Sequence, residues 1–208
     1  MARKLKHKPD LKVVLVGAKS VGKTCLLRRY LDRKYVESES TLGASFVLKL
    51  WHSYSVAIWV DTAGEERFAG LSSFYCRGAG AAILAFDPTD KTSFDALEAI
   101  FIPLLDAARE DCLKVVVGTK FDIVDSNSRK VSNRDAVTLA RALNPSATAS
   151  PGDIAYFETS SLTGSNVDEA FEYIFDRVLM ANGDEKKFEV DDALVLKSYD
   201  SHGRCNKR

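Results

Sequence analysis

Short, almost continuous apolar runs alternate along the chain with longer segments in which apolar residues recur every three or four positions. The short runs predict strands at residues 11–16, 46–50, 55–60, 81–86, 113–117 and 154–157. The longer segments predict helices at residues 23–33, 92–110, 133–143 and 166–180. Because wholly apolar runs are typical of strands covered on both faces, the pattern predicts an α/β fold: a mostly parallel six-stranded sheet with helices on both faces.

Local signals refine the predicted elements. The runs at 46–50 and 55–60 are joined around His52-Ser53-Tyr54, which predicts one antiparallel pair at a sheet edge. Thr92 or Ser93 is expected to cap the helix that follows, and Pro103 is expected to kink it. Residues 144–153 are rich in Pro, Ser, Ala and Gly and are expected to form an exposed loop.

Length and charge indicate a single domain with tails. The 208 residues divide into a basic arm (1–9), a folded domain (10–180) and a tail (181–208) in which the pattern is lost and disorder is expected. The 29 basic and 29 acidic residues balance, so no global field favours nucleic acid. The four cysteines form no C-x-x-C pair, which is typical of a reducing compartment. No apolar run approaches the roughly 20 residues that cross a bilayer, so we expect a cytoplasmic protein.

The strongest motif lies between the first predicted strand and helix. Residues 17–24 read Gly-Ala-Lys-Ser-Val-Gly-Lys-Thr and match the phosphate-binding loop G-x-x-x-x-G-K-[ST]. Gly17 and Gly22 keep side chains away while backbone N–H groups surround a polyphosphate, and the helix N-terminus favours an anion. Lys23 would neutralise the phosphates, and the Thr24 hydroxyl would bind the accompanying Mg²⁺. The motif and its setting predict a P-loop NTPase.

Three further motifs follow strand ends and select guanine. Asp61-Thr62-Ala63-Gly64 can hold the magnesium shell and meet the γ-phosphate. In residues 119–122, Thr-Lys-Phe-Asp, the carboxylate can accept two hydrogen bonds from guanine that adenine cannot supply, while the Lys120 stem covers the base. Residues 158–161, Glu-Thr-Ser-Ser, can offer backbone N–H groups to the guanine oxygen.

With these motifs, the chain resembles the Rab branch of the Ras superfamily over residues 10–180. The resemblance is carried by residues 40–46 (STLGASF), 61–68 (DTAGEERF), 74–79 (FYCRGA) and 158–164 (ETSSLTG). It implies a small G-domain that binds GTP or GDP with Mg²⁺ and hydrolyses GTP. It also implies that residues 64–75 form a segment ordered only by the γ-phosphate.

The resemblance also implies residue roles. The metal ligands would be Thr24, Thr41 and Asp61, and the catalytic residues Glu65, Lys23 and Gly64. Phe46, Trp59 and Tyr75 match the aromatic trio of the Rab effector surface, with ordinary core packing as the alternative. The nucleotide would be bound by the following set: Gly17, Lys19, Ser20, Val21, Gly22, Lys23, Thr24, Cys25, Thr41, Gly64, Thr119, Lys120, Asp122, Ser160 and Ser161.

Two departures from the family concern hydrolysis. Glu65 stands where most members have the glutamine that orients the attacking water, and a carboxylate repels the phosphate. Lys19 replaces a small residue; it either points to solvent or reaches the γ-phosphate or the space of an activator's arginine finger. These departures predict slow or atypical hydrolysis. The alternatives are a non-hydrolysing GTP-binding module and a P-loop kinase, for which we find no acceptor site or lid.

Three departures concern the base pocket, the sheet and the tail. Thr119 replaces the usual asparagine and Leu162 a lysine that often flanks the base, which predicts a lower nucleotide affinity. Val60 separates Trp59 from Asp61, so either a bulge is present or Trp59 faces the other side. Cys205, four residues from the end, is either a prenylation site or a free thiol.

The resemblance implies protein effectors, an exchange factor and a GTPase-activating protein as partners. We expect a monomer that acts in vesicle and membrane trafficking. It would associate reversibly with the cytosolic face of intracellular membranes, with prenyl-mediated contact through Cys205 as one route.

Overall fold

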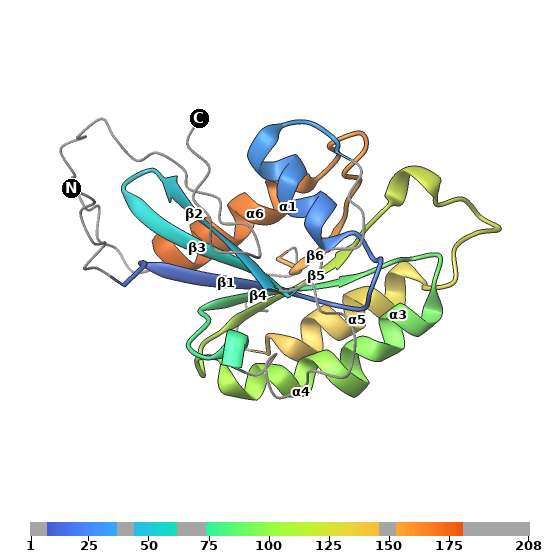
Figure 1. The fold of residues 1–208 in the computed structure, drawn as a ribbon. Helices are drawn as coiled ribbons and strands as arrows, with labels where there is room; N and C mark the ends of the chain where they lie inside the picture. Colours follow the sequence, from blue (N-terminus) through green and yellow to red (C-terminus); the bar gives the residue numbers. More distant parts are fainter. Residues whose placement is uncertain (1–7, 37–43, 62–73, 146–152, 181–208) are drawn as a thin grey trace.

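The computed structural model describes residues 8–36, 44–61, 74–145 and 153–180 (Figure 1). For residues 44, 45 and 61 the description is limited to the backbone. The N-terminal arm, the tail and most of the loop 144–153 therefore lie outside the described residues.

A six-stranded sheet forms the centre of the molecule, in the order β2-β3-β1-β4-β5-β6. All neighbouring strands are parallel except β2 and β3, which confirms the single antiparallel pair at one edge. The strands are β1 (Leu11–Val16), β2 (Ala44–Trp51), β3 (Tyr54–Asp61), β4 (Ala81–Phe86), β5 (Leu113–Gly118) and β6 (Tyr156–Glu158).

Helices cover both faces of this sheet, as the pattern predicts (Figure 1). α1 (Lys23–Asp32) and α6 (Val167–Phe175) lie on one face, and α6 continues into a π-helical turn (Asp176–Met180). α3 (Lys91–Ala96), α4 (Ile102–Leu104) and α5 (Asn133–Leu143) lie on the other.

The central strands β1, β4 and β5 are largely apolar because hydrophobic clusters cover both faces of the sheet there. In β1, Leu15 packs in the cluster with α1 and α6, whereas Val14 and Val16 pack in the cluster with α3 and α5. All six residues of β4 are buried. Because these strands pair in parallel, the carboxyl ends of β1, β3, β4, β5 and β6 lie at the same end of the sheet, where parallel-sheet proteins bind ligands.

The helix after β4 differs from its prediction in two ways. Its N-cap is Asp90, with extended backbone and a carboxylate that accepts a hydrogen bond from the Thr92 N–H, so the expected cap at Thr92 or Ser93 is wrong. Asp90 is the N-cap because its carboxylate accepts the hydrogen bond of the N–H two residues ahead. A π-helical turn (Leu97–Phe101) precedes α4, which contains Pro103, and the expected kink at Pro103 stays a prediction. A 3₁₀ turn (Leu105–Ala107) ends the segment earlier than expected.

The β2–β3 hairpin has a continuous register. Phe46 pairs with Trp59, and Trp51 pairs with Tyr54 across the turn, so no bulge interrupts the described pairs. Val60 is buried on the face of α1 and α6, while Trp59 packs on the opposite face. The extra residue therefore does not separate Trp59 from Phe46.

Candidate functional site

The phosphate-binding loop follows β1 and lies tightly against β4. Gly17 has φ 147°, and a Cβ there would sit 2.2 Å from the Ala85 carbonyl oxygen, so only glycine fits. Gly22, with φ 98°, is the N-cap of α1. The loop thus turns sharply from β1 into α1, as the motif requires.

Lys23 is folded back onto this loop. It is only 6% exposed, and its Nζ donates to the carbonyl oxygens of Gly17 at 2.7 Å and Ala18 at 2.8 Å. In the described part of the chain no side chain caps α1 at Gly22, so the helix N-terminus is not shielded by a capping group. Ammonium, helix end and loop amides together form a site suited to phosphate.

Thr119 connects the phosphate loop to the segment that follows β5. It is buried, and its Oγ1 lies 2.5 Å from the Val21 carbonyl oxygen and 2.9 Å from that of Phe86. Its backbone N–H also donates to Phe86 at 2.9 Å. The threonine therefore takes a bridging position between two strands and the loop.

Lys120 is held by Asp87, at the end of β4. Their Nζ and Oδ2 atoms lie 2.9 Å apart, and the Asp87 side chain is only 10% exposed. Burial would raise the pKa of Asp87, but hydrogen bonds from Lys120 and Thr89 outweigh it and hold the pKa below its ordinary value. The Lys120 head is fixed while its stem remains available to cover a base.

Asp122 and Ser160 meet across the ends of β5 and β6. The Ser160 hydroxyl donates to Asp122 Oδ1 at 2.5 Å and accepts from the Thr163 N–H at 3.1 Å. The Phe121 N–H donates to Thr159, and the Thr159 N–H donates to Gly118. The structure therefore brings together Asp122 and Ser160, which are 38 residues apart in the sequence.

Arg129 forms an ion pair with Glu158, the last residue of β6. It lies 2.8 Å from Glu158, which also accepts from the Tyr156 hydroxyl. Burial would raise the pKa of Glu158, but Arg129 and Tyr156 lower it.

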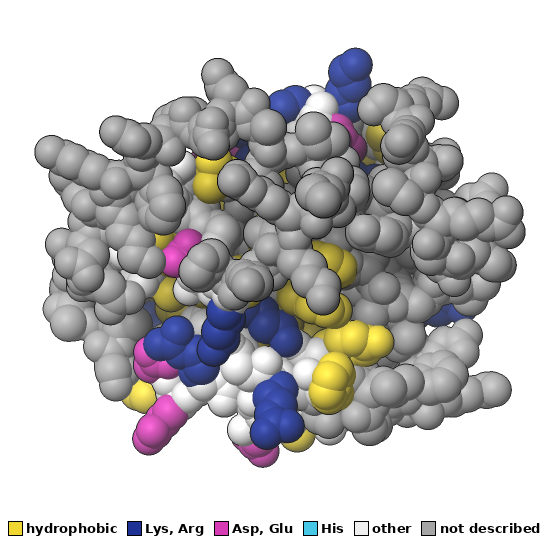
Figure 2. All heavy atoms as spheres, turned by 60° about the vertical axis from the view of Figure 1, so that its left-hand side comes forward, with side chains coloured by type: hydrophobic (Ala, Val, Ile, Leu, Met, Phe, Trp, Pro, Cys, Tyr) yellow, Lys and Arg dark blue, Asp and Glu magenta, His cyan; other side chains and the backbone are white. Residues whose placement is uncertain are grey.

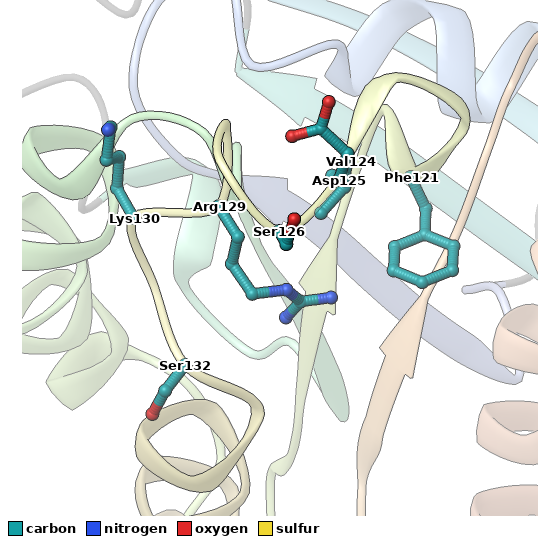
Figure 3. A pocket seen from close by; sticks show the side chains of 7 residues that line it. All are labelled: Phe121, Val124, Asp125, Ser126, Arg129, Lys130 and Ser132. Atoms are coloured by element: carbon teal, nitrogen blue, oxygen red, sulfur yellow. The ribbon is translucent and has the colours of Figure 1, made fainter.

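An open pocket of about 440 Å³ lies beside Arg129 and is lined by the segment after β5 (Figure 3): Phe121, Val124, Asp125, Ser126, Arg129, Lys130 and Ser132. It is beside the Lys120–Asp122 segment and contains none of the phosphate-loop residues.

The three aromatic residues lie in one row, in which Phe46 stacks on Trp59 and Trp59 meets Tyr75 at a tilt. The ring centroids of Phe46 and Trp59 lie 4.9 Å apart, and those of Trp59 and Tyr75 5.7 Å apart. Phe46 is 49% exposed, which argues against ordinary core packing. The Lys12 Nζ lies 5.1 Å from the Trp59 ring. Figure 2, turned toward the hairpin side, shows basic and hydrophobic side chains next to one another.

The remaining expected site residues divide into two groups. Lys19 and Ser20 are exposed, Thr24 and Cys25 are half-buried in the first turn of α1, and Ser161 is half-buried. Thr41, Gly64, Glu65, Cys205 and the Asp61 side chain lie outside the described residues. Among the described residues, no group of three or more His, Cys, Asp or Glu side chains is placed to hold a metal ion. Nor does that part of the chain contain a helix of the length and apolarity that a membrane span needs.

Sequence reasoning missed two residues of this region. The motifs assign no role to Asp87, although its position directly after β4 is a usable signal. Arg29, on the exposed side of α1, donates to the Thr163 carbonyl, a contact that no local pattern indicates.

The sequence of this chain is similar to those of known proteins. A model of the Ras family matches residues 12–180. The human Ras-related protein Rab-20 is 39% identical over 202 residues, covering 83% of this chain and 86% of its own length. Ras-related protein RABG3f of Arabidopsis thaliana is 35% identical, covering 88% and 89%. Ras-related protein Rab7 of Pisum sativum is 36% identical, also covering 88% and 89%.

These matches span the phosphate loop, the Asp122 segment and the six-stranded sheet that holds them. The chain therefore belongs to the Rab family of small GTPases, within the Ras superfamily.

Proposed function

We propose that residues 10–180 form a switch domain whose nucleotide site is the edge built by the phosphate loop and the segments after β4, β5 and β6. The observation that carries this proposal is the position of Lys23, buried over its own loop at an uncapped helix end, with Thr119 connecting that loop to the base segment. Lys23 would bind the β- and γ-phosphates, and Asp122 would accept from guanine.

The magnesium ion of GTPases fits the donor chemistry here. A hydroxyl at Thr24, in the first turn of α1, with Thr41 and Asp61 would supply the hard oxygen ligands that Mg²⁺ prefers. When bound, the ion neutralises charge on the phosphate oxygens. The loop amides and Lys23 hold the phosphates in line for attack by water.

The second part of the proposal is slow hydrolysis. Glu65, in place of glutamine, accepts a hydrogen bond from water but cannot donate one to the γ-phosphate when ionised. Lys19 is exposed on the phosphate loop. We propose that its cation would crowd the space that an activator's arginine finger needs. The protein would then remain mainly in its GTP form. The competing function is a module that binds GTP without hydrolysing it.

The third part concerns partners. The aromatic surface of Phe46, Trp59 and Tyr75 is partly exposed and apolar, which suits a protein effector. We propose that effectors bind there in vesicle trafficking, with an exchange factor and an activator controlling the nucleotide. Reversible attachment through Cys205 would bring the domain to the cytosolic face of a membrane.

The test is GTP turnover by the purified protein with magnesium, with the bound nucleotide identified. We expect guanine nucleotide in the wild type, loss of it in Lys23→Ala, and faster single-turnover hydrolysis in Glu65→Gln. Removal of magnesium by a chelator should speed nucleotide release.

Two outcomes would change the proposal. If wild-type turnover does not exceed that of Lys23→Ala while GTP still binds, the non-hydrolysing module is the better description. If no guanine nucleotide binds, the assignment of Asp122 is wrong.

A further inference from the structure

Arg29 joins the helix of the phosphate loop to the loop that follows β6. It lies in the last turn of α1, the helix that begins at Lys23. Its Nη2 donates to the Thr163 carbonyl oxygen at 2.9 Å, across 134 residues of sequence. Because a guanidinium is charged and planar, this hydrogen bond is stronger and more directional than one between neutral groups.

The neighbouring Gly164 shows how closely this loop approaches the guanidinium. Gly164 has φ 93°, and a Cβ on it would lie 2.5 Å from Arg29 Nη2, 3.0 Å from Nε and 3.1 Å from Cζ. Any side chain there would push the guanidinium away. The loop is therefore shaped to receive Arg29.

A chain of hydrogen bonds continues from this contact to the guanine-reading carboxylate. The Thr163 N–H donates to Ser160 Oγ, and the Ser160 hydroxyl donates to Asp122 Oδ1. The loop is also closed on itself, since the Gly164 N–H donates to the Ser160 carbonyl and the Ser160 N–H to that of Ser165. A displacement of Thr163 is consequently transmitted to Ser160 and Asp122.

We propose that Arg29 is a positioning residue for guanine recognition, acting through Thr163 and Ser160 on Asp122. The inference rests on the proposed nucleotide site. It predicts that Arg29 controls how the base is read without touching the nucleotide. Since the base is common to both nucleotides, loss of Arg29 should affect GDP and GTP to the same extent.

The first experiment compares the dissociation rate of GDP from Arg29→Ala, Arg28→Ala and wild type. Arg28 is its exposed neighbour on α1 and is the matched control. We expect release to be roughly tenfold faster from Arg29→Ala, the equivalent of one charge-assisted hydrogen bond, and unchanged from Arg28→Ala. Arg29→Lys, which keeps the cation but not the planar fork, should be intermediate and serves if Arg29→Ala does not fold.

The second experiment measures base discrimination. Inosine diphosphate lacks the 2-amino group that Asp122 would accept from, so its affinity relative to GDP reports how well the carboxylate is aligned. The preference for GDP should fall in Arg29→Ala, and Arg29→Ala combined with Ser160→Ala should be no worse than Ser160→Ala alone. If Arg29 served only to stabilise α1, its loss would weaken the binding of GDP and of inosine diphosphate equally, and the preference for GDP would be unchanged.

The experiments distinguish an error in the role of Arg29 from an error in the proposed nucleotide site. If wild type releases guanine nucleotide slowly but Arg29→Ala and Arg29→Lys match Arg28→Ala in both measurements, the role of Arg29 is overturned and the site stands. If wild type does not bind guanine nucleotide, the site itself is overturned.

Discussion

Thr119 shows how one side chain can limit a site. Its hydroxyl lies within hydrogen-bonding distance of the carbonyl oxygens of Val21 and Phe86, but it carries only one hydrogen and can donate to one of them at a time. An asparagine amide carries two. The connection between phosphate loop and base segment is therefore present here with fewer donors than the family's usual residue provides.

Substitutions at Thr119 should alter nucleotide retention in opposite directions. Thr119→Ala removes the donor and should speed GDP release roughly tenfold, whereas Thr119→Asn should slow it below the wild-type rate. Stopped-flow release of a fluorescent GDP analogue measures both. Thr138→Ala, which removes an exposed hydroxyl that donates within α5, is the control. Equal rates for Thr119→Ala and wild type would contradict the connecting role.

At the residue scale, the sequence places residues best where a motif concentrates the chemistry. The spacing of Gly17, Lys23, Asp122 and Ser160 puts them just beyond strand ends, and the structure has them there. Their roles toward the nucleotide stay predictions. Asp87 has only its position after a strand as a signal and Arg29 has none, because their contacts depend on side chains that meet only in the folded chain.

At the scale of elements, Glu172 on α6 holds the sheet edge and α1 together. Its carboxylate accepts from the Tyr30 hydroxyl at 2.9 Å and from the Trp51 indole N–H at 2.6 Å. Tyr30 is fully buried and stacks on Phe171. One carboxylate thus connects α6 to α1 and to the end of β2, the strand that also carries Phe46.

Removing this carboxylate should loosen both contacts. Glu172→Ala leaves two largely buried donors without their partner and should lower the free energy of unfolding by about 2–4 kcal/mol in a urea titration. Glu172→Gln keeps one acceptor and should cost less. Glu169→Ala, at an exposed position one turn away, should change stability by less than about 0.5 kcal/mol. A Glu172→Ala loss as small as that of Glu169→Ala would refute the connection.

The elements themselves were largely predictable. Residues 11–16, 81–86 and 133–143 form elements with the expected bounds, because largely apolar runs mark the two strands and a helical period marks the helix. The last strand is shorter and later than expected, at Tyr156–Glu158. The error at Asp90 arises because several adjacent residues could cap a helix, and only the backbone geometry decides among them.

At the scale of the whole molecule, two buried carboxylates link stability to pH. The pKa values of Asp87 and Glu158 are both held below their ordinary 3.8 and 4.5 by basic partners. A carboxylate with a lowered pKa stabilises the fold fully above its ordinary value and loses that contribution as pH falls through the folded-state value. Stability should therefore decline in acid, below the ordinary values.

Urea unfolding at pH values from about 6 to about 3 tests this expectation. Wild type should lose stability steeply over the acid part of that range, and Asp87→Asn and Glu158→Gln should each start lower and show a shallower loss. Asp135→Asn, at an exposed position on α5, should keep the wild-type slope. Parallel curves for all four proteins would show that the two ion pairs do not govern the acid limb.

The long sequence separation of these contacts also bears on how the protein is made. Thr119 reaches back 98 residues to Val21, and Thr163 meets Arg29 across 134. During synthesis the phosphate loop leaves the ribosome early, but its partners follow only after most of the domain has been translated. Until those partners are translated, the apolar faces of β1 and α1 stay exposed and the phosphate loop has no base segment with which to retain a nucleotide.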